Sequence, residues 1–316
     1  MPDAFSVPNA FSDEETLLVS IARDLLVRKP GERIPTVAEY QDRFGVGSGT
    51  VQSRLRALAA VGAVRVQARG HQGTVLVSRS LPSLWSLARM APVTGILPLP
   101  EALEPVSLAA ALRRAFQRLE IPLELLYLHG SARRIALVGR NEADFTIVSG
   151  PAAEARRAEI SAWLCKDLGP QSYHRADSIV VLLGRSCAHG RPVRRVGIDP
   201  TSHDHSLLTT LEFPAEQGYE HEPMPHTRLP SAVAAGQIDA AIWLQTSLVI
   251  PLSIVGITSR SLQRAEAIAA NDALAHAVLI GPQEQEAVAA VLREVDLSGL
   301  PGIQDEILRS DVLPLY

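Results

Sequence analysis

Cysteine, lysine and long apolar runs are all scarce in this chain of 316 residues. Its two cysteines, Cys165 and Cys187, form no C-x-x-C pair, so we expect buried thiols rather than a disulfide framework or a structural zinc site. The longest apolar stretch, residues 248–257, is about half as long as a membrane span. Residues 1–10 lack the basic and apolar segments of a signal peptide. These absences predict a cytoplasmic globular protein without membrane contact.

The chain has only two lysines, Lys29 and Lys166, and we expect neither at the end of a strand. A pyridoxal-phosphate enzyme needs a lysine to form its Schiff base. The sequence also lacks the Gly-x-x-x-x-Gly-Lys phosphate loop. Residues 45–49 match Gly-x-Ser-x-Gly but follow no predicted strand, so they indicate a helix start rather than an esterase elbow. We therefore expect no cofactor and no catalytic residue, and an enzyme acting on a small metabolite is the weaker alternative.

Acidic residues are absent from residues 43–100, although residues 1–42 carry eight acids and four bases. The acid-free stretch contains seven arginines, at positions 43, 54, 56, 65, 69, 79 and 89. Because the whole chain has a net charge of −4, this basic surface is local. Binding to a partner with many phosphates would explain it, and chance clustering in an arginine-rich chain is the alternative.

The first eighty residues predict three helices followed by a two-stranded wing. Capping boxes at residues 12–15 and 36–39 indicate the starts of two helices. Ser48 is placed to cap a third helix over residues 49–61. Apolar residues then alternate along residues 63–67 and 74–77, which predicts two strands joined by a glycine-containing turn. The pattern predicts a winged helix-turn-helix.

In a helix-turn-helix, the start of the second helix enters the major groove of double-stranded DNA, and a wing can approach the backbone. The residues expected there are short polar side chains, arginines and the turn between the strands. The candidate DNA-binding residues are Arg43, Ser48, Thr50, Gln52, Ser53, Arg54, Arg56, Arg69, Gly70, His71, Gln72 and Gly73.

Residues 44–58, followed by Gly62 and a Gly-x-x-Gly wing, resemble the winged helix of the GntR superfamily. The resemblance implies binding to a DNA operator, and Gly49, where many relatives have a bulkier or basic residue, leaves the base preference open. A protein–protein module is the alternative use of this fold, but the acid-free basic block favours DNA. We expect a homodimer, because regulators with two-fold symmetry place two such domains on neighbouring half-sites.

From residue 92 onward, short apolar strands alternate with helices, which predicts an α/β domain with mainly parallel strands. The fold class is therefore mixed, an N-terminal α+β winged helix-turn-helix followed by a two-lobed α/β domain. The expected strands lie near residues 93–99, 122–128, 144–149, 178–183, 193–199, 239–244 and 277–280. The expected helices lie near residues 103–119, 131–138, 152–168, 204–211, 229–235, 262–270 and 284–294.

Two segments, residues 136–148 and 232–243, each read as a helix that ends on glycine, a turn with an aspartate and a buried strand. This arrangement looks like the type 2 periplasmic-binding-protein fold, which the sensing domains of LysR-type regulators share. We expect a DNA-binding domain at 1–80, a linker at 81–91 with an apolar face, and an effector domain at 92–316. The lobes are expected at 92–185 with 255–316, and at 190–250.

The combination of both domains, with residues 130–134 leading to Asp144 and Phe145, resembles the YhfZ family of predicted transcriptional regulators. The resemblance implies DNA binding together with a pocket for a small-molecule effector. It implies no particular ligand. A constitutive DNA-binding protein with a degenerate pocket is the alternative.

In open α/β lobes, a ligand lies beyond the carboxyl ends of the strands. Gly130 with Ser131, and Thr201 with Ser202, supply hydroxyls and free amides at helix starts, so we hypothesise an anionic effector bearing a carboxylate or phosphate. Ordinary helix capping by the two serines is the alternative. The candidate effector-binding residues are Pro98, His129, Gly130, Ser131, Ser149, Thr201, Ser202, His203, Gln245 and Thr246.

Metal-binding side chains gather between residues 203 and 226. They are His203, Asp204, His205, His221, Glu222 and His226. Their spacing fits no familiar metal site, and histidines in polar loops are more often solvated or hydrogen-bonded, so we expect no metal.

Overall fold

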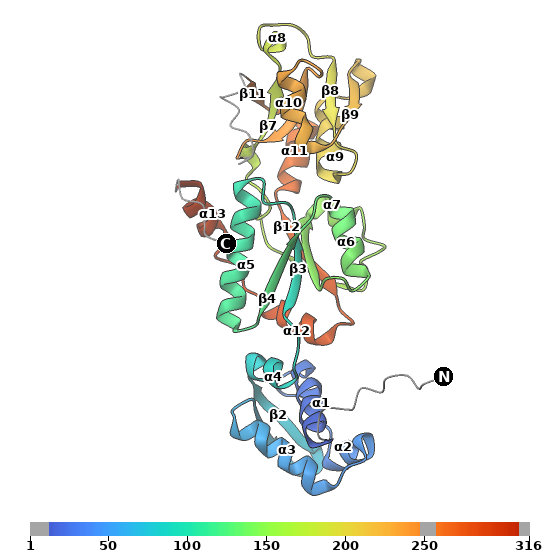
Figure 1. The fold of residues 1–316 in the computed structure, drawn as a ribbon, viewed down its shortest axis with the longest axis vertical. Helices are drawn as coiled ribbons and strands as arrows, with labels where there is room; N and C mark the ends of the chain where they lie inside the picture. Colours follow the sequence, from blue (N-terminus) through green and yellow to red (C-terminus); the bar gives the residue numbers. More distant parts are fainter. Residues whose placement is uncertain (1–12, 247–256, 310–316) are drawn as a thin grey trace, which may run out of the picture. The chain divides into compact units, whose positions relative to one another are not determined.

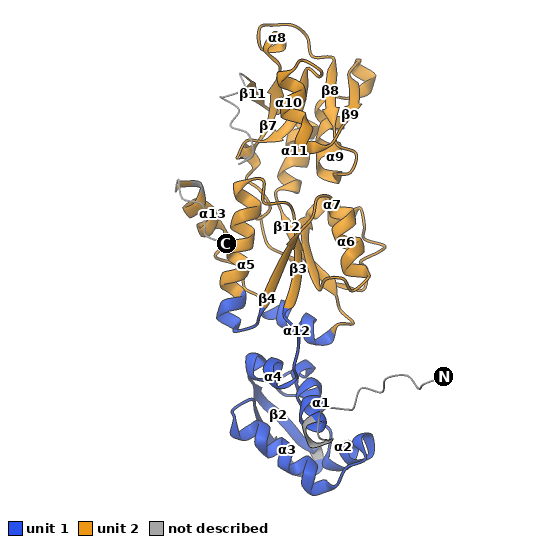
Figure 2. Ribbon diagram, viewed as in Figure 1, with its two compact units in different colours: residues 1–92, 116–122, 286–294 blue, residues 93–115, 123–285, 295–316 orange. Residues whose placement is uncertain are grey.

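The computed structural model describes residues 13–246 and 257–309. The chain divides into two compact units, drawn in blue and orange in Figure 2. The first runs to Pro92 and includes residues 116–122 and 286–294. The second holds residues 93–115, 123–285 and 295–316.

The first unit contains the predicted helices, strands and wing (Figure 1). Its elements are α1 (Asp13–Val27), α2 (Val37–Phe44), α3 (Ser48–Ala60), β1 (Val64–Ala68), β2 (Thr74–Arg79) and α4 (Leu81–Leu87). The capping box at the start of α2 is confirmed, because Thr36 Oγ1 accepts from the Glu39 amide at 3.1 Å and the Glu39 carboxylate accepts from the Thr36 amide at 2.6 Å. The box expected at residues 12–15 begins outside the described residues.

The predicted cap of α3 is wrong by one residue. Gly47, not Ser48, has the extended N-cap conformation, and its carbonyl accepts from the amides of Thr50 and Val51. Within the described residues, no side chain caps this helix. Ser48 is therefore the first helical residue and its side chain is exposed.

The wing is an antiparallel pair of strands, β1 and β2, joined by a 3-10 turn at Gly70–Gln72. The chain that precedes α2 extends this pair, because the Ile34 amide donates to the Thr74 carbonyl and the Leu76 amide donates to the Glu32 carbonyl, both at 2.9 Å. The wing is thus held by three extended segments of the same unit.

The predicted linker at 81–91 forms the short helix α4, which packs on α1. Leu84 and Trp85 are buried there. The Trp85 indole nitrogen donates to the Ala91 carbonyl at 3.1 Å, and Arg23 donates to the Ala88 carbonyl at the same distance. The apolar face of the predicted linker therefore packs inside the first unit.

In the second unit, a five-stranded sheet has the order β4-β3-β5-β12-β6. β3 pairs in parallel with β4 and β5, whereas β12 is antiparallel to both β5 and β6. Figure 1 shows α5 and α6 on opposite sides of this sheet. The strands are β3 (Val93–Leu97), β4 (Leu123–Tyr127), β5 (Phe145–Ser149), β6 (Trp163–Asp167) and β12 (Ala277–Pro282), and the helices that follow them in the chain are α5 (Leu103–Leu119), α6 (Ser131–Gly139), α7 (Gly150–Glu154) and α13 (Leu300–Arg309). The helix α12 (Glu286–Glu294) belongs to the first unit.

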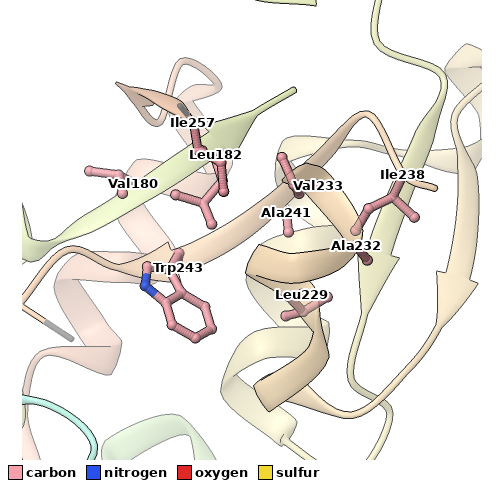
Figure 3. Close-up of a cluster of buried hydrophobic side chains, with 9 residues drawn as sticks. All are labelled: Val180, Leu182, Leu229, Ala232, Val233, Ile238, Ala241, Trp243 and Ile257. Atoms are coloured by element: carbon pink, nitrogen blue, oxygen red, sulfur yellow. The ribbon is translucent and has the colours of Figure 1, made fainter. Parts of the chain in front are cut away.

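A second five-stranded sheet has the order β11-β7-β10-β8-β9. Alternate residues of the central strand β10 face opposite sides: Ala241 and Trp243 pack in the cluster beneath α10 shown in Figure 3, and Ala240 and Ile242 pack with residues of α9 and α11. The elements are β7 (Ile179–Leu183), β8 (Arg195–Ile198), β9 (Glu220–Pro223), β10 (Ala240–Leu244), β11 (Thr258–Ser261), α8 (Arg185–Ala188), α9 (His203–Glu212), α10 (Leu229–Ala234) and α11 (Ala265–Leu274).

Both sheets are mixed rather than mainly parallel, and two strands lie in a different lobe from the one expected. β7 pairs antiparallel with β10, and β11 pairs antiparallel with β7, so both belong to the second sheet. An apolar run indicates that a strand is buried, but the partner is chosen by long-range backbone hydrogen bonds, which the run does not reveal.

The helix expected at residues 152–168 is wrong. α7 ends at Glu154, and residues 163–167 form the edge strand β6. Ile160, Trp163 and Leu164 have helical spacing, but a short apolar run alone does not separate a helix from a strand. The strand places Cys165 on the surface instead of in the core, and Lys166 donates to the Val295 carbonyl at 2.5 Å.

Gly95 in β3 is required by the close approach of Phe145 from the neighbouring strand. A Cβ atom at residue 95 would lie 2.4 Å from the Phe145 Cζ atom. We expect Gly95→Ala to lower the free energy of unfolding by about 1–3 kcal/mol, because the buried ring must shift. Urea unfolding measures this. Gly299→Ala is the control, since its Cβ would meet no atom within 4 Å, and equal effects of both substitutions would contradict the interpretation.

Candidate functional site

The predicted DNA-binding residues lie on the end of α2, the first turns of α3 and the wing. Among those on the helices, Arg43, Ser48, Gln52, Ser53 and Arg56 are exposed, and Thr50 and Arg54 are half-buried. On the wing, Arg69, Gly70 and His71 are exposed, Gly73 is half-buried, and the Gln72 side chain lies outside the described part of the structure. The structure therefore brings these residues onto the elements that a helix-turn-helix uses for contact.

Asp24 in α1 positions α2. Its carboxylate accepts from the Tyr40 hydroxyl at 2.7 Å and from Arg28 at 2.9 Å, and the Arg43 guanidinium lies 3.5 Å away. Burial alone would raise the pKa of Asp24, but the hydrogen bonds from Arg28 and Tyr40 lower it below its ordinary value. The carboxylate is thus kept charged, and Arg43 is partly neutralised by it.

The seven arginines of the acid-free stretch do not share one role. Arg79 is half-buried and donates to the Leu26 carbonyl, which ties β2 to α1, and burial lowers its pKa. Arg54 is also half-buried. The exposed members are Arg43, Arg56, Arg65, Arg69 and Arg89.

Within the second unit, a pocket of about 190 Å³ is lined from both sheets. The loops that follow β3 and β4 supply one wall, and α9 with the end of β10 supplies the other. A second pocket, of about 420 Å³, shares Leu99, His129 and His226 with the first and extends over residues 199–201 and 223–227. This is the position expected for a ligand, beyond the carboxyl ends of the strands.

Asp199, at the end of β8, is the centre of a hydrogen-bond network beside these pockets. Its buried carboxylate accepts from the Thr201 amide and hydroxyl at 2.9 and 2.6 Å, and from the His226 amide at 3.0 Å. Burial alone would raise the pKa of Asp199, but the hydrogen bonds from Thr201 and His226 lower it. His129 Nε2, from the loop after β4, lies 2.9 Å from the same carboxylate and so links the two lobes.

His205 is held as a neutral imidazole. Its Nδ1 accepts from the Asp199 amide at 3.1 Å, so the proton is on Nε2, which donates to the Ile242 carbonyl at 3.2 Å. Burial lowers the pKa of His205 to about 4. Both ring nitrogens are therefore used inside the lobe.

Two further histidines on the pocket wall are also neutral at neutral pH. The His226 ring stacks on the Trp243 indole, with centroids 4.4 Å apart and planes at 14°. Burial, together with the neighbouring imidazoles of His205 and His129, lowers the pKa of His226 to about 3. Burial also lowers the pKa of His174, whose Nε2 bonds to the Asn271 side chain at 3.0 Å.

A second link between the lobes joins Ser149, at the end of β5, to Asp204 in α9. The Ser149 hydroxyl donates to the Asp204 carboxylate at 2.7 Å and accepts from the Ala152 amide at 3.2 Å. Burial raises the pKa of Asp204. Nearby, the buried Arg134 guanidinium donates to the carbonyls of Leu128 and Ile147, so it stabilises the loop ends from inside the first sheet.

The predicted effector-binding residues are divided by the structure. Those that line a pocket are Pro98, His129, Thr201 and Ser202, and those that do not are Gly130, Ser131, Ser149, His203, Gln245 and Thr246. Ser202 caps α9, accepting from the His205 amide at 3.4 Å, whereas Gly130 rather than Ser131 is the N-cap of α6. Thr246 donates to the Glu104 carboxylate.

Several pocket-lining residues were not predicted as ligand contacts. His205 and His226 were noted only as metal-binding types, and Trp243 only as the end of a strand. Tyr173 and His174 come from a segment without regular structure, which has no periodic signal. The predicted strand ends near His129 and Thr201 were the signals that pointed to this network.

The residues of metal-binding type between 203 and 226 do not converge on one point, although the ring centroids of His205 and His226 lie 5.5 Å apart. His221 bonds to the Phe213 carbonyl at 2.7 Å, while Asp204 and His205 face different partners. In the described ranges, no group of three or more His, Cys, Asp or Glu side chains is placed to hold a metal ion.

Among the described helices, none is long and apolar enough to cross a membrane.

The neutral state of His205 predicts a specific pH dependence. An unfolded histidine has a pKa of 6.5 and the folded one about 4, so between these values the unfolded chain binds more protons and stability falls as the pH is lowered. We expect the free energy of unfolding to fall by about 1.4 kcal/mol per pH unit more in the wild type than in His205→Gln. Urea unfolding from pH 7 to 4 measures this, with exposed His71→Gln as the control. Parallel curves for wild type and His205→Gln would contradict it.

Comparison with known proteins gives two family matches. The family described as the YhfZ C-terminal domain matches residues 81–316, and a helix-turn-helix domain family matches residues 29–76. The uncharacterized protein YhfZ of Escherichia coli strain K12 is 28% identical over 230 residues, covering 73% of this chain and 74% of that protein.

Solved structures also match a large part of the chain. YhfZ from Shigella flexneri gives a TM-score of 0.48 at 21% identity, covering 72% of this chain and 100% of that one. A variant regulatory domain of OxyR2 from Vibrio vulnificus gives 0.46 at 12% identity, covering 67% and 95%. The first family covers most of the chain. The chain therefore belongs to the YhfZ family, with an N-terminal helix-turn-helix domain and a C-terminal YhfZ domain.

Proposed function

We propose that this protein is a transcription regulator that binds an operator through its helix-turn-helix and responds to a small-molecule effector held in the second unit. The observation that carries the proposal is the pocket whose walls come from both sheets, in a chain that also has a helix-turn-helix domain. The links from His129 to Asp199 and from Ser149 to Asp204 join the two walls. A ligand there would change the relative stability of lobe arrangements, because it contacts both.

On the DNA side, α3 is the recognition helix of the proposal, with Gln52, Ser53 and Arg56 directed to the duplex and the wing tip contacting its backbone. The exposed arginines and the absence of acidic residues from residues 43–100 support this.

The GntR-like character of the domain and a homodimeric state belong to the same proposal. Light scattering of the full chain, with and without DNA, tests the dimer, and a monomer in both would contradict it. The place of action is the cytoplasm, where the DNA is.

The DNA contact predicts a change in salt dependence. Replacing Arg56 or Arg69 by alanine should weaken binding and reduce the slope of log affinity against log salt concentration by about 0.9 for each phosphate that the variant no longer neutralises. Fluorescence anisotropy with a short duplex selected from random-sequence DNA measures both quantities. Arg133→Ala, an exposed arginine of the second unit, is the matched control. An unchanged slope in both wing and helix variants would contradict the proposed interface.

Effector control predicts that binding in the pocket is coupled to DNA affinity. A metabolite that raises the melting temperature of the full chain should change its affinity for the selected duplex by at least about fivefold. A thermal-shift screen followed by anisotropy with and without the compound measures this. If a compound binds in the pocket and stabilises the chain but leaves its affinity for DNA unchanged, the protein is a constitutive DNA-binding protein. The proposed control by an effector is then wrong.

A further inference from the structure

The lining of the pocket between the two sheets indicates what kind of molecule fits it. Among the described residues that line either pocket, none is a lysine or an arginine. Three of the imidazoles on the wall, those of His174, His205 and His226, are neutral at neutral pH because burial lowers their pKa. The nearby Arg134 guanidinium is bound to backbone carbonyls and lines neither pocket.

Carboxylates, in contrast, do line the pockets. Glu101 and Asp204 face the first and Asp199 faces the second. A carboxylate or phosphate on the ligand would lose its hydration without gaining an ion pair, and it would be repelled by the charged carboxylate of Asp199. The helix starts at residues 131 and 202 suggested an anionic ligand. The lining of the pockets disfavours such a ligand.

Asp199 and Asp204 are poor sites for a cation as well. Both oxygens of Asp199 have a partner within the protein, in Thr201, the His226 amide and His129. One oxygen of Asp204 accepts from Ser149, and burial raises the pKa of Asp204, which favours its neutral form.

Trp243 and His226 make the pocket lining aromatic. The two rings stack on each other, so each covers one face of the other, and aliphatic side chains such as Leu99, Leu108 and Ile242 line the same pocket. A lining of aromatic and aliphatic groups favours a ligand that contains a planar ring. Figure 3 shows the Trp243 ring at one edge of the buried cluster in which it packs.

The Trp243 indole also has an unused donor. The residue is 4% exposed, and in the described part of the chain no acceptor bonds to its Nε1 atom. A buried N–H without an acceptor is unfavourable, so a ligand that supplies one gains affinity. A cation that offers only donors would leave this group unsatisfied.

We propose that the effector of this protein is an uncharged, planar, ring-bearing molecule with a hydrogen-bond acceptor on its edge, stacked in the pocket against Trp243 and His226. The inference rests on the proposed function, since it names the ligand class of the same site. It replaces the anionic effector with a neutral one.

Three small probes of nearly the same shape test the charge directly. Benzamide is neutral and offers an acceptor, benzoate is an anion, and benzamidinium is a cation that offers only donors. We expect isothermal titration of the full chain at neutral pH to show benzamide binding at least about fivefold more tightly than either ion. Tighter binding of benzoate or of benzamidinium, or no binding of any probe at millimolar concentration, would overturn the proposal.

The role of Trp243 is tested with a matched pair of variants. Trp243→Phe keeps a ring and removes the N–H, so it should weaken benzamide binding about fivefold and leave benzamidinium, which offers no acceptor, unaffected. Trp163→Phe, which removes an indole that lines neither pocket, should bind all three probes as the wild type does. Equal effects of the two substitutions would contradict the assigned contact.

These titrations contain no DNA, so they separate the ligand class from the proposed regulation. If benzamide does not bind more tightly than the two ions, the proposal of a neutral ligand is wrong. The experiment that couples effector binding to DNA affinity is not affected by that result. A neutral ligand that binds with the expected preference but does not change DNA affinity overturns the regulation alone.

Discussion

The burial of the Asp199 carboxylate among neutral donors, rather than beside a lysine or arginine, constrains much of the second unit. A buried charge must be compensated, and in the described residues the donors come from the turn at Thr201 and the amide of His226, with His129 of the other lobe beside them. These contacts define the turn before α9 and the position of the loop that carries His226. They also bring the loop after β4 to the second sheet. The pocket exists where these three segments meet.

The same network determines the electrostatic character of the pocket. Because the Asp199 backbone amide donates to His205 Nδ1, that imidazole has no free lone pair to take up a proton. The neutral histidines and the stacked indole then form an apolar wall. Beside it lies the Asp199 carboxylate, both oxygens of which already have hydrogen-bond partners. Charge is thus distributed unequally along the chain: exposed arginines lie in the first unit, and no basic lining surrounds the pockets of the second in the described residues.

The helix-turn-helix could be predicted from the sequence because its signals are local. The capping box at 36–39, the glycine that ends α2 and the alternation along the wing all act within a few residues. The acid-free stretch at residues 43–100 is also one continuous segment, so the sequence alone indicated a DNA partner. The cap of α3 was missed because serine is the commoner cap, while the backbone conformation at Gly47 decided the helix start.

The pocket could be predicted only in outline, because it depends on contacts between distant segments. Strand ends at 98, 129 and 201 were found by the rule for open α/β lobes, but Tyr173 and His174 follow an edge strand whose pattern resembled a helix. Which sheet β7 joins depends on backbone pairing that an apolar run does not encode, and β11, with the sequence TSRS, has no apolar run from which to predict a strand. An anionic ligand was inferred from helix starts alone, and nothing in the sequence indicated the neutral state of the buried histidines, because it arises only in the folded chain.

The three tryptophans of the chain fall in three different places: Trp85 in α4 of the first unit, Trp163 in the first sheet of the second unit and Trp243 in its second sheet. Each indole has a different environment, respectively bonded to a carbonyl, partly buried on an edge strand, and stacked on an imidazole. The protein therefore contains its own set of fluorescent reporters. A chain that keeps one indole at a time would report separately on the DNA-binding end, the first lobe and the second lobe, without any attached dye.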